Sequence, residues 1–183
     1  EDESSGGHEN HGHAAGEPDP HFWLDPVMMK TAAATVCEAL CRARPESAAY
    51  FRENLARAQS DLDALDSRLG ALLAPYRGRT IYVFHPAFGY FAARYGLVQA
   101  AIEAGGREPS ARELARLTDR LRADRAGTVF IQSQFAVSAA ASLQRSLGVS
   151  LVELDPQPAD YLTALEKTGQ KIAASFEAAS GMK

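Results

Sequence analysis

The most regular hydrophobic pattern in the chain predicts a long helix over about residues 51–72. Apolar side chains recur there at alternating spacings of four and three, which places them along one helical face. The stripe consists of Phe51, Leu55, Ala58, Leu62, Leu65, Leu69 and Leu72. We expect this face to pack within the protein, although a dimeric coiled coil through Leu55, Leu62 and Leu69 would also cover it.

A preceding helix is predicted from Pro26 to about Arg44, because Asp25 is a good N-cap residue and proline suits the first helical position.

After Gly78 the pattern changes to strands that alternate with helices. The predicted strands cover residues 80–85, 97–103, 127–132 and 149–155. The predicted helices cover residues 87–95, 110–124, 136–147 and 159–179, and Ser110 with Glu113 has the spacing of a capping box in the second of them. Such alternation is typical of right-handed crossovers. The predicted class is therefore α/β: long linking helices plus a four-stranded parallel sheet covered by helices on both faces.

The first 18 residues have a different composition from the rest of the chain. They contain no large apolar side chain but include His8, His11 and His13 among acids and glycines. Such a segment cannot offset the entropy of ordering itself, so we expect a mobile, histidine-rich acidic loop. The predicted organisation is this loop at 1–18, linking helices at 19–78 and an α/β lobe at 79–183.

Composition narrows the classes of function. The chain has 183 residues, 46% of them hydrophobic, and a net charge of −4 with acids and bases interspersed. There is no basic face for phosphate, so nucleic acid is not an expected partner. No apolar run is long enough to span a bilayer, and residues 1–20 do not have the pattern of a secretory signal. Cys37 and Cys41 lie one helical turn apart; we expect them to be inert packing residues, with a metal-binding pair as the lesser alternative.

Each predicted strand ends in a polar or ionisable residue, namely His85, Glu103, Gln132 and Asp155. Ligands of open parallel sheets bind beyond this edge, although strands also end in polar residues simply because sheets end at water. His85 and Asp155 together with His21 offer two imidazoles and a carboxylate, a set that suits Zn²⁺, with Mn²⁺ or Fe²⁺ less favoured. The nearby histidine-rich tract also favours metal capture.

Four motifs in chain order resemble the zinc and manganese substrate-binding proteins of ABC importers. They are "DPHFWLDP" (19–26), "HPAFGYFAARYGL" (85–97), "EAGGREPSARELARL" (103–117) and "VELDPQPADYLTAL" (152–165). The resemblance implies one lobe of a two-lobed metal receptor, with metal ligands at His21, His85 and, less securely, Asp155. It also implies auxiliary capture by the loop histidines.

The same resemblance implies a periplasmic or extracytoplasmic binding protein that delivers zinc to an ABC permease and is not an enzyme. It further implies a first lobe, absent from this sequence, that supplies another histidine ligand. Two alternatives remain open. One is a zinc-dependent hydrolase that uses His21, His85 and Asp155, with Glu103 as base. The other is an interaction module, without metal, built on the apolar stripe.

Overall fold

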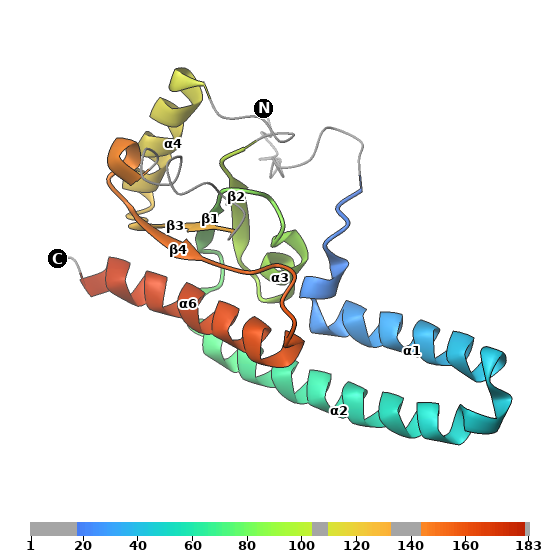
Figure 1. Ribbon diagram of the computed structural model, residues 1–183. Coiled ribbons are helices and arrows are strands. Elements are labelled where there is room, and N and C mark those ends of the chain that lie inside the picture. The colour runs from blue at the N-terminus through green and yellow to red at the C-terminus, as the bar shows by residue number, and fades with distance from the viewer. Residues whose placement is uncertain (1–17, 104–109, 133–143, 182–183) are drawn as a thin grey trace, which may run out of the picture.

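A helical hairpin and an α/β body make up the part of the chain that the structure describes. The computed structural model describes residues 18–103, 110–132 and 144–181. Figure 1 shows the two long helices of the hairpin, α1 (Pro26–Ala43) and α2 (Ala48–Leu73), extending away from the sheet. A 3-10 turn at Pro45–Ser47 joins them.

Helix α1 begins where the sequence predicted. The Asp25 side chain accepts a hydrogen bond of 2.8 Å from the backbone N–H of Val27, and Pro26 occupies the first helical position. An N-cap of this kind satisfies a backbone donor that has no partner within the helix. The predicted helix is confirmed, with its end at Ala43 rather than Arg44.

The apolar stripe of α2 packs inside the protein over its second half, as the sequence led us to expect. The buried side chains on this helix are Leu62, Leu65, Leu69 and Leu73. Leu65, Leu69 and Leu73 share the main core with helix α6 (Tyr161–Gly181), in which Gly169 lies directly against Leu69. The alternative, a coiled coil through Leu55, Leu62 and Leu69, does not fit this fold, because Leu62 and Leu69 are already buried, although Leu55 is only half-buried.

The sheet has four parallel strands in the order β2-β1-β3-β4. The strands are β1 (Thr80–Val83), β2 (Val98–Ala101), β3 (Thr128–Ile131) and β4 (Ser150–Glu153). Strand β2, the next strand in the chain, lies on one side of β1, whereas β3 and then β4 lie on the other side. The strand order therefore reverses at β1. The carboxyl end of such a switch point is where open parallel sheets bind ligands.

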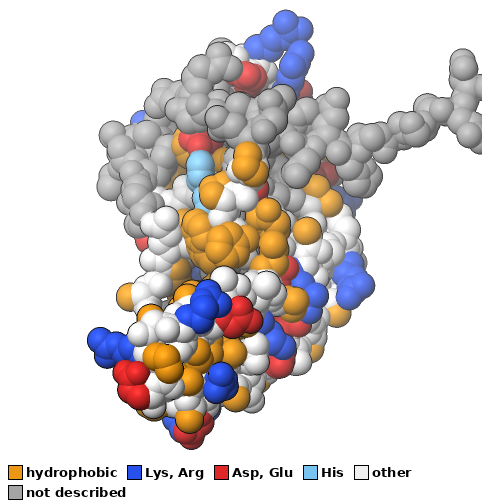
Figure 2. Space-filling model, turned by 90° about the vertical axis from the view of Figure 1, so that its right-hand side faces the viewer, with side chains coloured by type: hydrophobic (Ala, Val, Ile, Leu, Met, Phe, Trp, Pro, Cys, Tyr) orange, Lys and Arg blue, Asp and Glu red, His pale blue; other side chains and the backbone are white. Residues whose placement is uncertain are grey.

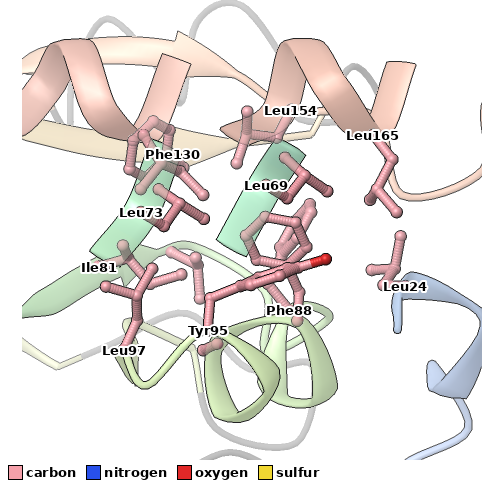
Figure 3. Packing of buried hydrophobic residues seen from close by; sticks show 14 of the residues in the cluster. Leu24, Leu69, Leu73, Ile81, Phe88, Tyr95, Leu97, Phe130, Leu154 and Leu165 are labelled. Carbon is pink, nitrogen blue, oxygen red and sulfur yellow. The ribbon is translucent and has the colours of Figure 1, made fainter. Parts of the chain in front are cut away.

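Helices cover both faces of the sheet, which confirms the predicted fold class. On one face Ile81, Val83 and Phe130 pack with α2, α6 and the short helix α3 (Gly89–Arg94), in the core drawn in Figure 3. On the other face Tyr82, Phe84 and Val129 form a smaller core with helix α4 (Ala111–Ala123). Neighbouring residues of one strand thus point to opposite faces, as the pleat requires.

The remaining predictions have mixed outcomes. The capping box of α4 is present: the Glu113 N–H donates to Ser110 Oγ at 3.4 Å, and the Ser110 N–H donates to Glu113 Oε2 at 2.7 Å. Of the helix predicted at 136–147, residues 136–143 lie outside the described residues, and 144–147 are helical. The loop proposed for 1–18, with His8, His11 and His13, lies almost wholly outside them as well. The division at 78/79 stays a prediction; helices on both sides of it share one core.

Candidate metal centre

His85 lies at the carboxyl end of β1, next to the switch point of the sheet. Its ring is 40% exposed, and the buried Pro86 follows it. His85 Nδ1 is in hydrogen-bond contact with the Glu103 carboxylate, which follows the neighbouring strand β2. Because β1 and β2 are parallel neighbours, their carboxyl ends meet and bring an imidazole and a carboxylate together. Glu103 thereby holds one ring nitrogen and orients the other, Nε2, for a ligand.

His21 has a carboxylate partner of the same kind. Asp19 Oδ1 accepts from the backbone N–H of His21 at 2.9 Å and lies 2.7 Å from its ring Nδ1. One carboxylate oxygen therefore fixes both the backbone and the ring. The side chain of His21 is only 12% exposed. Carboxylates that engage the second nitrogen of a histidine are the usual outer partners of metal-binding imidazoles, since they set the tautomer and the direction of the ring.

The segment that carries His21 is fastened to the α/β body. Trp23 Nε1 donates to the backbone oxygen of Pro156 at 2.7 Å, and the Tyr161 hydroxyl donates to the backbone oxygen of Trp23 at 2.7 Å. Leu24, 1% exposed, enters the main core near Leu165 of α6 (Figure 3). The short motif is thus held to the body by contacts with residues more than 130 positions away, in addition to its local hydrogen bonds.

The α3 side of the site also accommodates Asp19. The Tyr90 hydroxyl donates to the backbone oxygen of Asp19 at 3.3 Å. A Cβ placed on Gly89 would lie 3.0 Å from Asp19 Oδ2, closer than side chains normally approach. Gly89 therefore leaves the space in which the carboxylate that holds His21 fits.

Helix α3 is anchored to α2 by an ion pair and a phenol. Arg94 pairs with the Asp66 carboxylate through two of its nitrogens, and the Tyr95 hydroxyl donates to Asp66 Oδ1 at 3.1 Å. The hydrogen bond from Arg94 holds the pKa of Asp66 below its usual value, and burial raises the pKa of Tyr95. Since α3 begins only a few residues after His85, this contact holds the turn that carries His85 in place relative to α2.

The rings of His21 and His85 meet at a distance that suits a shared metal ion. Their centroids are 5.5 Å apart with an interplanar angle of 79°. With a Zn–N bond of about 2.0–2.1 Å and a ring centre about 1.1 Å behind the nitrogen, two imidazoles on a tetrahedral zinc have centres about 5 Å apart. The observed separation is within about half an ångström of that value. Figure 2 shows histidine at the molecular surface, bordered by acidic and hydrophobic side chains.

Asp155 is not assembled with the two histidines in this structure. Its side chain is exposed, and Oδ1 accepts from the backbone N–H of Gln157 at 2.9 Å. The next residue, Pro156, nevertheless contacts Trp23, so this turn borders the His21 segment. Among residues 18–103, 110–132 and 144–181 no group of three or more His, Cys, Asp or Glu side chains is arranged to hold a metal ion.

Sequence reasoning missed the two carboxylates that support the histidines. Asp19 could have been found from its spacing, because an aspartate two residues before a histidine can accept from that histidine's N–H. The sequence placed Glu103 at the ligand-binding edge of the sheet and offered it as a catalytic base, but its contact with His85 depends on which strands are neighbours. Nothing in the sequence pointed to the bonds made by Trp23 and Tyr161.

A separate cavity lies at the opposite edge of the sheet. It has a volume of about 220 Å³ and is lined by the starts of β1 and β3, by Asp124 and by the last turns of α6. The hydroxyl of Tyr82 donates to Asp124 Oδ2 at 2.7 Å there. No histidine of the described residues lines this cavity, so we place the candidate site at the carboxyl edge, where His21 and His85 are.

Comparison with known proteins gives a consistent family assignment. Residues 1–175 match the family described as "ZnuA: Zinc-uptake complex component A periplasmic". The chain is 38% identical over 114 residues to the high-affinity zinc uptake system protein ZnuA of Paracoccus denitrificans, a match that covers 61% of this chain and 35% of that protein. It is 28% identical over 183 residues to the zinc-binding protein AdcA of Streptococcus pyogenes, covering 93% of this chain and 35% of that protein.

Solved structures show the same fold. A crystal structure of ZnuA superposes with a TM-score of 0.82 at 36% identity, covering 88% of this chain and 62% of that one. A ZnuA deletion mutant with zinc bound gives a TM-score of 0.82 at 35% identity, covering 90% and 65%. The chain spans about a third to a half of the length of the curated relatives it matches. In the described part of the chain, no helix has both the length and the apolar character needed to cross a bilayer.

Proposed function

The chain belongs to the family of the periplasmic zinc-uptake complex component A, and from this premise we propose that it binds Zn²⁺ as cargo for an ABC importer. His21 and His85 are the proposed ligands, each through Nε2. Asp155, or a group from outside the described residues, completes the coordination. The location is extracytoplasmic, and the partner is the permease that accepts the metal.

The meeting of the two imidazoles, each with a carboxylate at Nδ1, carries this proposal. Neutral imidazole is a preferred zinc ligand, and the carboxylate partner increases its basicity. Each ring keeps a carboxylate at the same nitrogen, and the two rings, in edge-to-face contact at 5.5 Å, have a separation that two ligands of one zinc ion would also have. The names of the relatives, several of which refer to zinc, agree with this choice of metal.

A binding protein also explains the site better than a hydrolase does. A hydrolase would need a base that faces a metal-bound water. Glu103, the base considered from the sequence, is instead engaged with His85 Nδ1. A carboxylate in that position supports the ligand. We therefore expect zinc capture without hydrolytic turnover.

The test is a zinc titration of the full chain and of three variants. Removal of an outer partner of a metal ligand costs about 10–100-fold in affinity, so loss of a direct ligand should cost at least about 100-fold. We expect His21→Ala and His85→Ala each to weaken Zn²⁺ binding by that factor. Deletion of residues 4–16 is the control and should change the affinity little, because it removes only auxiliary histidines.

Two results would contradict the proposal. Unchanged affinity in His21→Ala would show that the two rings do not share a metal, and an equal loss from the loop deletion would move the main site to the loop. Zinc-dependent hydrolysis of an ester, peptide or phosphoester that Glu103→Gln abolishes would replace the binding protein with an enzyme.

A further inference from the structure

Helix α1 carries two cysteine side chains that face each other, away from the histidine site. Cys37 and Cys41 are separated by one helical turn, and their Sγ atoms lie 4.0 Å apart. Cys37 is 6% exposed, whereas Cys41 is half-buried, with Sγ 3.7 Å from the backbone oxygen of Ala48 at the start of α2. The pair therefore lies where α1 meets the turn of the hairpin.

The separation of the two sulfur atoms suits a single metal ion. Two Zn–S bonds of about 2.3 Å at a tetrahedral angle place their sulfurs about 3.8 Å apart. The observed distance of 4.0 Å needs an adjustment of about 0.2 Å, which a small rotation of either side chain supplies. A separation of 4.0 Å is an ordinary contact between unbonded sulfurs, so the two thiols are not joined in a disulfide, and Cys41 would exchange its contact with the Ala48 oxygen for the metal.

A groove beside the sulfurs gives access and room for further ligands. Its volume is about 520 Å³. Its lining consists of Ala34, Cys37, Glu38, Cys41, Arg42, Arg52 and Leu55. Glu38 and the two arginines give the groove a net positive charge of one, so its charges do not attract a hard cation such as Mg²⁺ or Ca²⁺. The selective feature is the sulfur pair, and thiolates favour soft metals.

We propose that Cys37 and Cys41 form a second metal-binding site, which takes a soft, thiophilic cation of the Cd²⁺ or Zn²⁺ type through two thiolates and completes its shell with water. Binding releases two protons, one from each thiol, because the thiolate is the ligand. The site is independent of the proposed zinc cargo site, since the two share no residue.

The test uses the full chain, reduced, with the His21→Ala/His85→Ala double variant to remove the cargo site. Cd²⁺ is the probe, because Cd–thiolate bonds give an ultraviolet charge-transfer band that imidazole and carboxylate ligands do not. We expect the double variant to develop this band up to one Cd²⁺ per chain and to release two protons. Cys41→Ser and Cys37→Ala, added separately to the double variant, should each abolish the saturable band.

A second readout covers the case in which a cysteine variant folds poorly. Stoichiometric Cd²⁺ should protect both thiols of the double variant from alkylation, as counted by intact mass, and Mg²⁺ should not. The absence of a band in the reduced double variant would overturn the proposal. So would a band that persists in Cys41→Ser, or alkylation of both thiols at an unchanged rate with Cd²⁺ present.

Discussion

Replacement of Gly169 by alanine tests the packing that joins the helical hairpin to the α/β body. Gly169 lies within α6, where a Cβ would be 2.3 Å from Leu69 Cδ2 and 3.5 Å from Leu72 Cδ2. Leu69 is fully buried in the main core, so its side chain has no solvent to move into. The close approach of α6 to α2 therefore depends on the absence of a side chain at this position.

Two opposing terms set the size of the effect. Carbon atoms attract best at about 3.5–4.0 Å, so the new methyl must displace Leu69 by about 1.2 Å or more. Overpacking of this kind costs about 1–3 kcal/mol. Alanine in place of glycine within a helix stabilises the folded protein by about 0.8–1.0 kcal/mol through its higher helix propensity. We expect a net loss of about 1 kcal/mol in the free energy of unfolding, or a melting temperature lower by about 2–4 °C for a chain of this length.

Gly70 in α2 provides the matched control. It also lies inside a helix, but a Cβ there would meet nothing within 4 Å. Gly70→Ala should therefore gain helix propensity without any steric cost and stabilise the protein by about 0.5–1 kcal/mol. Urea and thermal unfolding of both variants measure the two shifts. If Gly169→Ala stabilises the protein as Gly70→Ala does, the tight contact between α2 and α6 is refuted.

Two further predictions concern the histidine site and its frame. Gly89→Ala should push the Asp19 carboxylate from the place where it holds His21. We expect Zn²⁺ binding to weaken by about 10-fold with little change in melting temperature. An affinity equal to that of the wild type would show that Asp19 has no such role. Asp66, whose pKa is lowered by Arg94, contributes stability that is present above its unfolded pKa near 3.8 and lost as the pH falls through the lower folded value. Asp66→Asn should remove this part of the acid dependence. Urea unfolding between pH 5 and pH 3 measures it, and a free energy of unfolding that falls equally steeply with pH in both proteins would contradict the prediction.

Local chemistry determined most of the secondary structure. The Asp25 cap, the proline after it and the Ser110 capping box depend on residues a few positions apart, so the sequence alone predicts where α1 and α4 begin. The strands that alternate with helices indicated a parallel sheet for the same reason, because each element shows its own hydrophobic period. The two histidines could be recognised as candidate ligands from their residue type and from the motifs around them.

Contacts between distant residues could not be read from the sequence in this way. An apolar stripe on α2 has the same pattern whether it faces a second copy or α6, and the choice depends on Gly169 lying against Leu69 across 100 positions. The pairing of His85 with Glu103 likewise follows from the order of the strands, which no local pattern encodes.

The sequence by itself therefore determined the chemical groups of the candidate site and the elements that carry them. Only the tertiary structure decided that His21 and His85 meet at 5.5 Å while Asp155 points to its own turn. The physical reason is that residue types and periodicities act over a few residues, whereas the distance between two side chains depends on how whole elements pack. In this protein that packing is set by the buried leucines of α2, by the switch in strand order at β1, and by the hydrogen bonds that Trp23 and Tyr161 make across the fold.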